Sequence, residues 1–221
     1  MNPLNKPLTN QGAKLLILLA GPVCWSLCAW FFVDNNATQL EMVHTWGAAS
    51  QTLCLTEPWR WITASLLHLS ASHLIMNGIG LMAMGIFGLH IFGIFQLFTV
   101  TWVTAWCGTA AALWQPGFVI GSSAAIFGIL GAILAFSLRR ISETQWTTLI
   151  FASLVALAMS ALTPGDFSAH FAGLISGALV GVNTEILDHT CPQQTTRRRR
   201  RAQWVVIIQF TACVLVLFKA Y

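Results

Sequence analysis

Charge is scarce in this chain. Asp, Glu, Lys and Arg together make up 8% of its 221 residues, whereas they make up about 25% of a typical soluble domain. Hydrophobic residues make up 56%. This composition excludes an ordinary soluble fold and predicts an integral membrane protein. A spanning helix needs about 20 residues, so the chain has room for six or seven spans in one domain.

The cysteines show no pattern of metal binding or pairing. The chain has six of them, with no C-x-x-C pair and no zinc-like spacing. We therefore expect no disulfide framework, no metal and no cofactor. The net charge of +4 comes mostly from Arg197–Arg201. We interpret this cluster as a topology signal rather than as a nucleic-acid patch, with attraction to anionic lipid as a second interpretation.

Long apolar runs separated by short polar connections predict an all-α polytopic membrane protein, a six-helix bundle with a seventh, C-terminal transmembrane helix. The bias of lysine and arginine places the N-terminus in the cytoplasm. The predicted segments are a cytoplasmic tail over 1–14, a six-span domain over 15–187, a basic cytoplasmic linker over 188–203 and a seventh span over 204–218. The six spans are predicted over 15–33, 62–86, 95–113, 119–136, 146–162 and 169–187, with a tight turn over 88–93 and an outer turn over 163–168.

Two serines open the apolar run 119–136. Ser122 and Ser123 follow Gly121, and alanines and further glycines come after them. Small residues in such a run also have a simpler interpretation, because they allow helices to pack closely in lipid. The serines alone therefore do not indicate a catalytic site.

Three polar residues of other spans strengthen the catalytic interpretation. The predicted topology places His170 at the outer end of its span and places His73 and Asn77 in the outer half of theirs, at the depth of Ser123. Polar and ionisable side chains at membrane depth are costly and face the bundle interior or a water-filled cavity. The convergence of four such residues predicts a functional site.

A Ser–His pair requires hydrogen-bond contact, so that the imidazole can take the hydroxyl proton. The helices that carry the pair must then pack unusually closely. One of these spans has a glycine at every fourth residue, at Gly173, Gly177 and Gly181. The other has two positions without a side chain, Gly128 and Gly131. This is the spacing of small residues that favours close approach of helices.

A tetrahedral intermediate also needs hydrogen-bond donors aimed at its oxyanion. His73 and Asn77 are four residues apart and therefore share a helix face. Both can donate, as can the backbone N–H of Ser123. The carboxylate nearest to His170 in the sequence is Asp166, in the outer turn, so we predict a dyad rather than a triad.

These residues resemble the motifs of the rhomboid intramembrane serine proteases, in the family's order and over about 125 residues. Glu57-Pro58-Trp59-Arg60 is similar to the family's Trp-Arg motif, and His68, His73 and Asn77 follow its spacing in the second span. The stretch from Gly121 to Gly131 is similar to its GxSG span. His170, Gly173 and Gly177 are similar to its HxxGxxxG span.

The resemblance implies six core helices and cleavage of transmembrane protein substrates in or near their membrane segments. It implies Ser123 as the nucleophile and His170 as the general base. His73 and Asn77 would line the oxyanion site, and Phe127 would support the histidine ring. Trp59, Arg60, Gly121, Gly128, Gly173 and Gly177 would be structural.

Two positions depart from the family pattern. Ala124 stands where the family has glycine, and His90 stands where it usually has glutamate. Ala124 leaves open a second function, a rhomboid-like protein that binds transmembrane segments without cutting them. Ser122 is a second candidate nucleophile, although its register to Phe127 and Gly128 is less favourable.

A third interpretation, that the histidines of the spans are haem or metal ligands, leaves Asn77 and Ser123 without a role. We expect a multi-pass protein of a bacterial inner (cell) membrane. Its partners would be the lipid bilayer and transmembrane protein substrates, with no nucleic acid.

Overall fold

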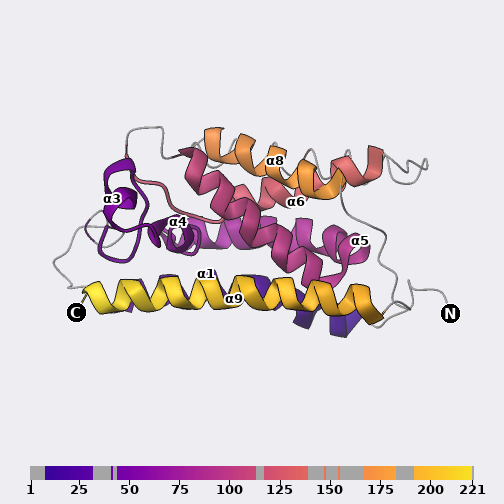
Figure 1. Ribbon diagram of the computed structural model, residues 1–221, viewed down its shortest axis with the longest axis horizontal. Coiled ribbons are helices and arrows are strands. Elements are labelled where there is room, and N and C mark those ends of the chain that lie inside the picture. The colour runs from indigo at the N-terminus through magenta and orange to yellow at the C-terminus, as the bar shows by residue number, and fades with distance from the viewer. Residues whose placement is uncertain are drawn as a thin grey trace.

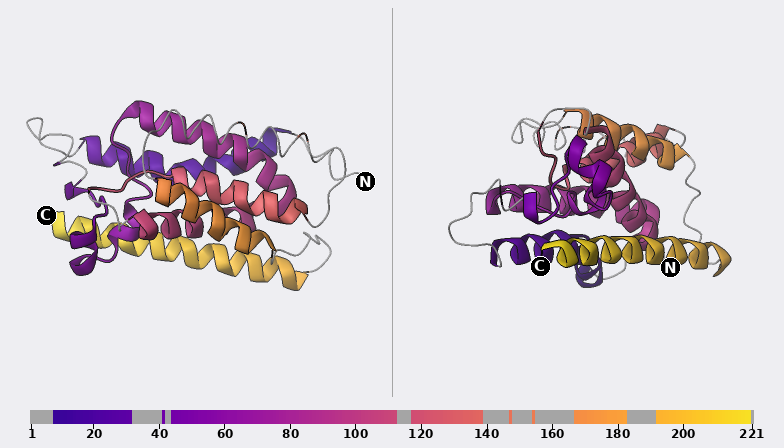
Figure 2. Two further views of the ribbon diagram at one scale, coloured as in Figure 1. Left: turned by 90° about the horizontal axis from the view of Figure 1, so that it is seen from above. Right: turned by 60° about the vertical axis from the view of Figure 1, so that its left-hand side comes forward.

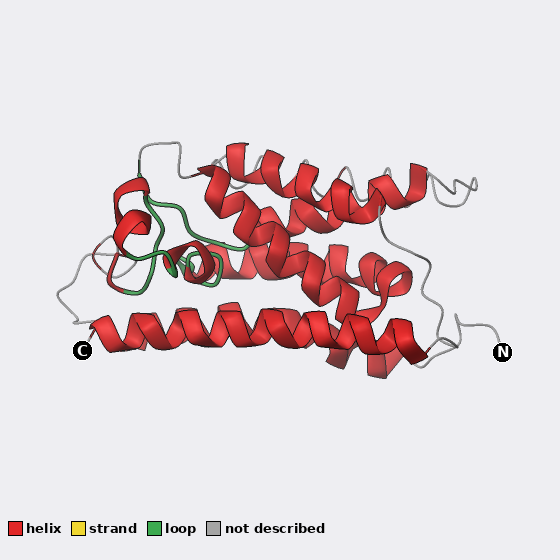
Figure 3. Ribbon diagram, in the orientation of Figure 1, coloured by secondary structure: helices red, strands yellow, loops and turns green. Residues whose placement is uncertain are grey.

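The computed structural model describes residues 8–31, 41, 44–112, 117–138, 147, 154, 167–182 and 192–220. Within these ranges the regular elements are all helices (Figure 3), which confirms the predicted fold class. In chain order the helices are α1 (Leu8–Phe31), α3 (Gln51–Thr56), α4 (Arg60–Thr63), α5 (Ala71–Ala112), α6 (Ser123–Leu138), α8 (Phe167–Val182) and α9 (Pro192–Ala220).

Helix α5 holds two of the predicted spans, which meet at Gly93. This residue has φ of 69° and ψ of 165°, a conformation that glycine adopts far more readily than other residues. A Cβ on Gly88 would lie 2.7 Å from Cδ1 of Leu97, although these residues are about 13 Å apart along a straight helix. The chain therefore folds back at Gly93. The predicted turn over 88–93 is too long, because the helix continues up to Phe92.

By length and composition, one helix of the described part of the chain can cross a membrane. It covers Ala71–Ala111 and contains both halves of α5. Three apolar helical stretches are shorter, namely Leu18–Trp30, Ser123–Ser137 and Phe167–Val182.

Helices α5, α6 and α8 pack against one another, and α1 and α9 pack against α5. Figure 1 shows α6 and α8 on one side of α5, with α1 and α9 on the other. Seen from above, α1 and α9 run along opposite parts of the molecule (Figure 2). Most side chains of α6 are buried on all sides of the helix, as expected for a helix that is apolar all round.

The two ends of the bundle differ in charge. Helix α9 begins at the end where α1 begins and finishes beside α3 and α4 (Figures 1 and 2). Arg197–Arg201, near the start of α9, therefore lie at the same end as the start of α1. We call this the arginine end and the other the loop end. The arrangement is the one that the bias of basic residues towards one membrane side requires.

Two helices begin before the spans predicted near the termini. Helix α1 begins at Leu8, within the predicted tail over 1–14. Helix α9 begins at Pro192, so Arg197–Arg201, within the predicted linker over 188–203, are part of the last helix. Arginine, glutamine and alanine are good helix formers, and proline is tolerated in a first turn.

Three predicted spans also differ from the helices. Residues 64–70 are not helical and separate α4 from α5, whereas a span over 62–86 was predicted. Residues 117–122 precede α6 in a non-helical conformation, and α8 begins at Phe167, within the predicted outer turn. Hydropathy reports burial and does not distinguish extended from helical backbone. The predicted span 146–162 lies outside the described residues apart from 147 and 154.

Candidate active site

Ser123 is the first residue of α6, and its side chain meets His170 of α8. The Oγ atom of Ser123 lies 2.9 Å from Nε2 of His170, which is hydrogen-bond distance. His170 is 6% exposed. The structure thus brings together the two side chains that the sequence predicted as a pair, although they are far apart in the chain.

The ring of Phe127 packs against one face of the His170 imidazole. It lies one turn after Ser123 on α6, so both side chains project from the same face of the helix. The rings of Phe127 and His170 are stacked, with centroids 4.5 Å apart and an interplanar angle of 17°. Stacking restricts rotation of the imidazole and keeps Nε2 directed at the serine.

Glycines bring α6 and α8 into backbone contact. A Cβ on Gly173, Gly177 or Gly181 would collide with the carbonyl oxygens of Ala124, Gly128 and Ala132, respectively. A Cβ on Gly131 would collide with the backbone of α8 at Leu174, and one on Gly128 with the side chain of Thr104. Such close approach in a membrane bundle needs small residues, and it is what allows the short side chains of Ser123 and His170 to touch.

Ser122 points elsewhere. It is fully buried, and its Oγ lies 3.4 Å from Nε2 of His68. The other ring nitrogen of His68, Nδ1, lies 3.3 Å from Oγ of Ser26 on α1 and 3.2 Å from the carbonyl oxygen of Leu66. Ser122 and His68 therefore belong to a buried network that joins α1 to the segment before α6. No spacing or motif in the sequence indicated that Ser26 takes part.

His73 and Asn77 lie beside the segment that leads into Ser123. A Cβ on Gly121 would be 2.9 Å from Cε1 of His73 and 3.3 Å from Nδ2 of Asn77. Gly121 has φ of 97°, which disfavours any residue with a Cβ. Its N–H donates to the carbonyl oxygen of Ala64 at 2.8 Å. Both conformation and space therefore require glycine at 121.

The amide of Asn77 is buried, and neither Nδ2 nor Oδ1 has a hydrogen-bond partner among the described residues. Unsatisfied buried amides are costly. A donor held in this way beside Gly121, two residues before Ser123, is suited to an oxygen atom of a bound molecule.

Arg60 makes polar contacts with several residues of the segment 44–60, at the loop end of the bundle. Its Nε lies 2.8 Å from Oε2 of Glu57 in a buried ion pair, and its Nη1 donates to the carbonyl oxygens of His44 and Ala48 at 2.6 Å and 3.0 Å. Ala49, directly after Ala48, exchanges two backbone hydrogen bonds with Val119. Arg60 thus stabilises the backbone around Ala48. The hydrogen bonds of Ala49 in turn hold Val119, in the segment that leads into Ser123. Trp59 is half-buried and packs against the core.

Ala124, the departure from the family pattern, faces a glycine of α5. A Cβ on Gly108 would collide with Cβ of Ala124 and would lie 2.8 Å from the carbonyl oxygen of Ala169. The methyl group of Ala124 therefore occupies space that residue 108 leaves open. Sequence reasoning missed Gly108, because no spacing rule pairs residues of different helices.

Three other residues that could take part in the chemistry need a separate account. His90 is exposed, and its Nδ1 lies 2.7 Å from the carbonyl oxygen of Ile86 in its own helix. Asp166 lies outside the described residues. Burial raises the pKa of the Cys54 thiol in α3, so this residue stays protonated and weakly nucleophilic. The described residues contain no group of three or more His, Cys, Asp or Glu that could hold a metal ion.

The fold and the site define a polytopic helical membrane protein with a Ser–His pair at the start of a buried helix. A family model described as Rhomboid domain matches residues 55–184, which is more than half of the chain. The chain belongs to the rhomboid family and is an integral, multi-pass membrane protein.

Curated relatives are similar over part of their length. RHOMBOID-like protein 1 of Arabidopsis thaliana is 31% identical over 137 residues, which cover 57% of this chain and 34% of the relative. Rhomboid protease GluP of Bacillus subtilis (strain 168) is 28% identical over 151 residues, 66% of this chain and 30% of the relative. Rhomboid protease GlpG of Pectobacterium atrosepticum is 28% identical over 174 residues, 73% of this chain and 62% of the relative. The chain thus spans less than two thirds of each.

Proposed function

We propose that this rhomboid protein is an intramembrane serine endopeptidase that hydrolyses peptide bonds in or near transmembrane segments of other membrane proteins. Ser123 is the nucleophile and His170 is the general base. The observation that carries the proposal is the 2.9 Å contact between Oγ of Ser123 and Nε2 of His170. A serine hydroxyl is a weak nucleophile until an adjacent base accepts its proton.

In the first half of the reaction, Oγ of Ser123 attacks the scissile carbonyl carbon, and the hydroxyl proton moves to Nε2 of His170. The carbonyl oxygen becomes an oxyanion. When the intermediate collapses, the C–N bond breaks and His170 returns the proton to the leaving amine. The product is an acyl-enzyme on Ser123. In the second half, His170 takes a proton from water, the hydroxide attacks the ester, and the proton returns to Ser123.

The oxyanion lies beside Asn77 and His73. The amide N–H groups of Asn77 stabilise the negative charge, since they have no partner among the described residues before substrate binds. Donors that are fixed before the reaction and used only in the transition state accelerate the chemical step. His73 and the backbone N–H of Ser123 are further donors, and the bare backbone of Gly121 allows His73 and Asn77 to approach.

Four proteins test the assignment when each is reconstituted in liposomes with a tagged transmembrane reporter substrate. They are the wild type, Ser122→Ala, Ser123→Ala and His170→Ala. We expect the wild type and Ser122→Ala to cut, because the Ser122 hydroxyl contacts His68 rather than His170, and the other two to leave the substrate intact. Cutting by Ser123→Ala would refute the proposed nucleophile.

A serine-reactive fluorophosphonate probe separates the protease from a rhomboid-like protein that only binds transmembrane segments. An active dyad forms a covalent adduct with the probe, and the adduct disappears in Ser123→Ala and His170→Ala. A folded wild type that neither reacts with the probe nor cuts several reporter substrates would favour the binding function.

A further inference from the structure

A groove at the arginine end lies between the second half of α5 and the first part of α9. It has a volume of about 840 Å³, and its lining includes Phe95 and Phe98 of α5, Trp204 and Ile207 of α9, and the two arginines Arg199 and Arg200. None of these residues belongs to the candidate active site. The volume is in the range of ligand pockets, about 300–1,000 Å³.

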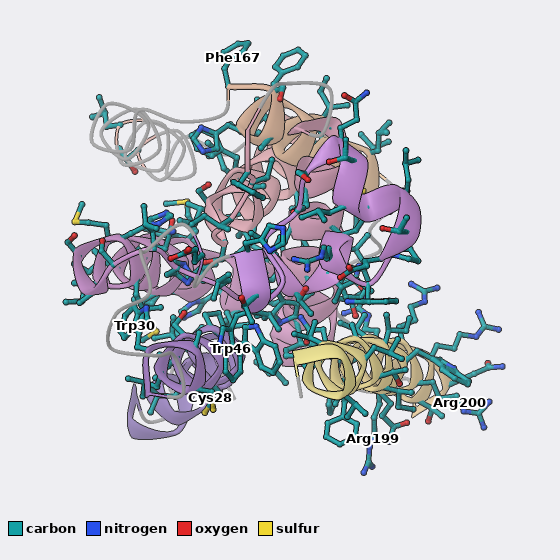
Figure 4. All side chains as sticks on the ribbon, turned by 90° about the vertical axis from the view of Figure 1, so that its left-hand side faces the viewer. Cys28, Trp30, Trp46, Phe167, Arg199 and Arg200 are labelled. Atoms are coloured by element: carbon teal, nitrogen blue, oxygen red, sulfur yellow. The ribbon has the colours of Figure 1, made fainter. Side chains whose placement is uncertain are left out.

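Arg198, the neighbour of these two arginines, faces inward and fixes the position of α9 beside the groove. Arg198 is 6% exposed, and its Nη1 donates to the carbonyl oxygen of Phe92 at 3.1 Å. Phe92 is the last helical residue before Gly93, so this hydrogen bond fixes α9 against the point where α5 folds back. Arg199 and Arg200, which follow it in α9, are exposed and line the groove (Figure 4).

Two cations line the groove, and its lining residues in the described part of the chain include no carboxylate. The described acidic residues are Glu41 and Glu57, both in the segment between α1 and α4. Glu57 forms an ion pair with Arg60. The occupant of the groove should therefore supply negative charge where Arg199 and Arg200 stand.

Apart from Gln203, the rest of the lining is apolar, and it is open to the surroundings of the bundle. Trp204 is 65% exposed and Ile207 is 51% exposed. In a membrane protein, such a surface contacts lipid. Arg200 and Ile207 are separated by about 10 Å along the helix, so the groove passes from a charged rim to an apolar floor over the distance between a phospholipid headgroup and the upper part of its acyl chains. A tryptophan between them has the usual depth of the membrane interface.

We propose that this groove binds one anionic phospholipid of the leaflet at the arginine end. The phosphate contacts the guanidinium groups of Arg199 and Arg200, which bind phosphate with directed pairs of N–H donors. The upper acyl chain lies along Phe95, Phe98 and Ile207. Basic pockets between transmembrane helices at the cytoplasmic side are sites of this kind.

Native mass spectrometry of the detergent-released protein tests the proposal, with phosphatidylglycerol and phosphatidylcholine of identical acyl chains. We expect the wild type to retain phosphatidylglycerol about tenfold more than phosphatidylcholine. Arg199→Gln/Arg200→Gln should lose this preference. The matched control is Arg197→Gln/Arg201→Gln, which removes the same charge from residues outside the groove and should keep it.

A second variant changes shape but not charge. Ile207→Trp fills part of the groove while all five arginines remain, so phosphatidylglycerol retention should fall toward the level of phosphatidylcholine. Equal losses in the two arginine double variants would overturn the proposal in favour of diffuse polybasic attraction. No preference in the wild type, or a lipid-free dimer that Ile207→Trp dissociates, would also overturn it.

Discussion

The contact between Gly108 and Ala124 gives the sharpest test of how the site is held together. Ala124 follows Ser123, and Ala169 precedes His170. A single added methyl group at residue 108 meets the Cβ of Ala124 and the carbonyl oxygen of Ala169. Gly108→Ala is therefore expected to displace the backbone beside both Ser123 and His170.

The expected cost can be worked out from this geometry. Overpacking a tight contact costs about 1–3 kcal/mol, and each 1.36 kcal/mol in the activation barrier changes a rate about tenfold. Since the strain acts beside the 2.9 Å contact of the dyad, we expect cleavage to fall about tenfold to a hundredfold. The melting temperature should fall as well, because α5, α6 and α8 separate.

The measurement is the initial rate of cleavage of a fluorescent transmembrane reporter in liposomes, together with thermal unfolding in detergent. The matched control is Gly78→Ala on the same helix, where the new Cβ would lie 3.7 Å from Cδ2 of Leu19, an ordinary contact. Alanine is more favourable than glycine in a helix by about 0.5–1 kcal/mol, so this control should keep its activity and its stability.

The double variant Gly108→Ala/Ala124→Gly moves the methyl group from one helix to the other. It should recover part of the lost activity, because the collision with Ala124 disappears while the contact with the Ala169 carbonyl remains. Wild-type cleavage by Gly108→Ala alone would refute the reasoning. So would a double variant that is no better than Gly108→Ala.

Three further substitutions separate catalytic from structural roles. Asn77→Ala should lower kcat about 10²- to 10³-fold, the cost of losing one oxyanion donor, with little change in melting temperature, and an unchanged kcat would exclude Asn77 from the oxyanion site. Arg60→Ala removes the guanidinium from its buried ion pair with Glu57, and breaking such a pair costs about 3–5 kcal/mol, so thermal unfolding should begin well below that of the wild type; an unshifted transition would contradict this structural role. Gly121→Ala places a Cβ 2.9 Å from Cε1 of His73 at a residue with φ of 97°, so it should abolish labelling by the fluorophosphonate probe. Full labelling would show that the backbone at residue 121 can adjust to a side chain.

Much of the candidate site could be predicted because its chemistry imposes spacing along single helices. The four-residue separation of His73 and Asn77, and that of Ser123 and Phe127, each define one helix face. The same holds for the glycines of α8, which the structure places against the carbonyl oxygens of α6. These relations depend only on helix periodicity, which is visible in the sequence.

Features that depend on two different helices, or on the end of one, could not be predicted in this way. The start of α6 at Ser123 follows from the conformation of Gly121 and from its hydrogen bond to Ala64, whereas hydropathy placed the span from residue 119. The partner of Ser122 is His68, and the chain between them gives no sign of that contact. Tertiary contacts of this kind decide which of the two adjacent serines faces His170.

The pair formed by Ala124 and Gly108 also bears on how the family motif should be interpreted. Close approach between α5 and α6 limits the total side-chain volume at the contact and does not require glycine on one particular side. A glycine on either helix satisfies that limit. Ala124 in this chain is therefore no argument against acylation of Ser123 as long as residue 108 is glycine. Alanine at both positions, 108 and 124, is the combination that should separate Ser123 from His170.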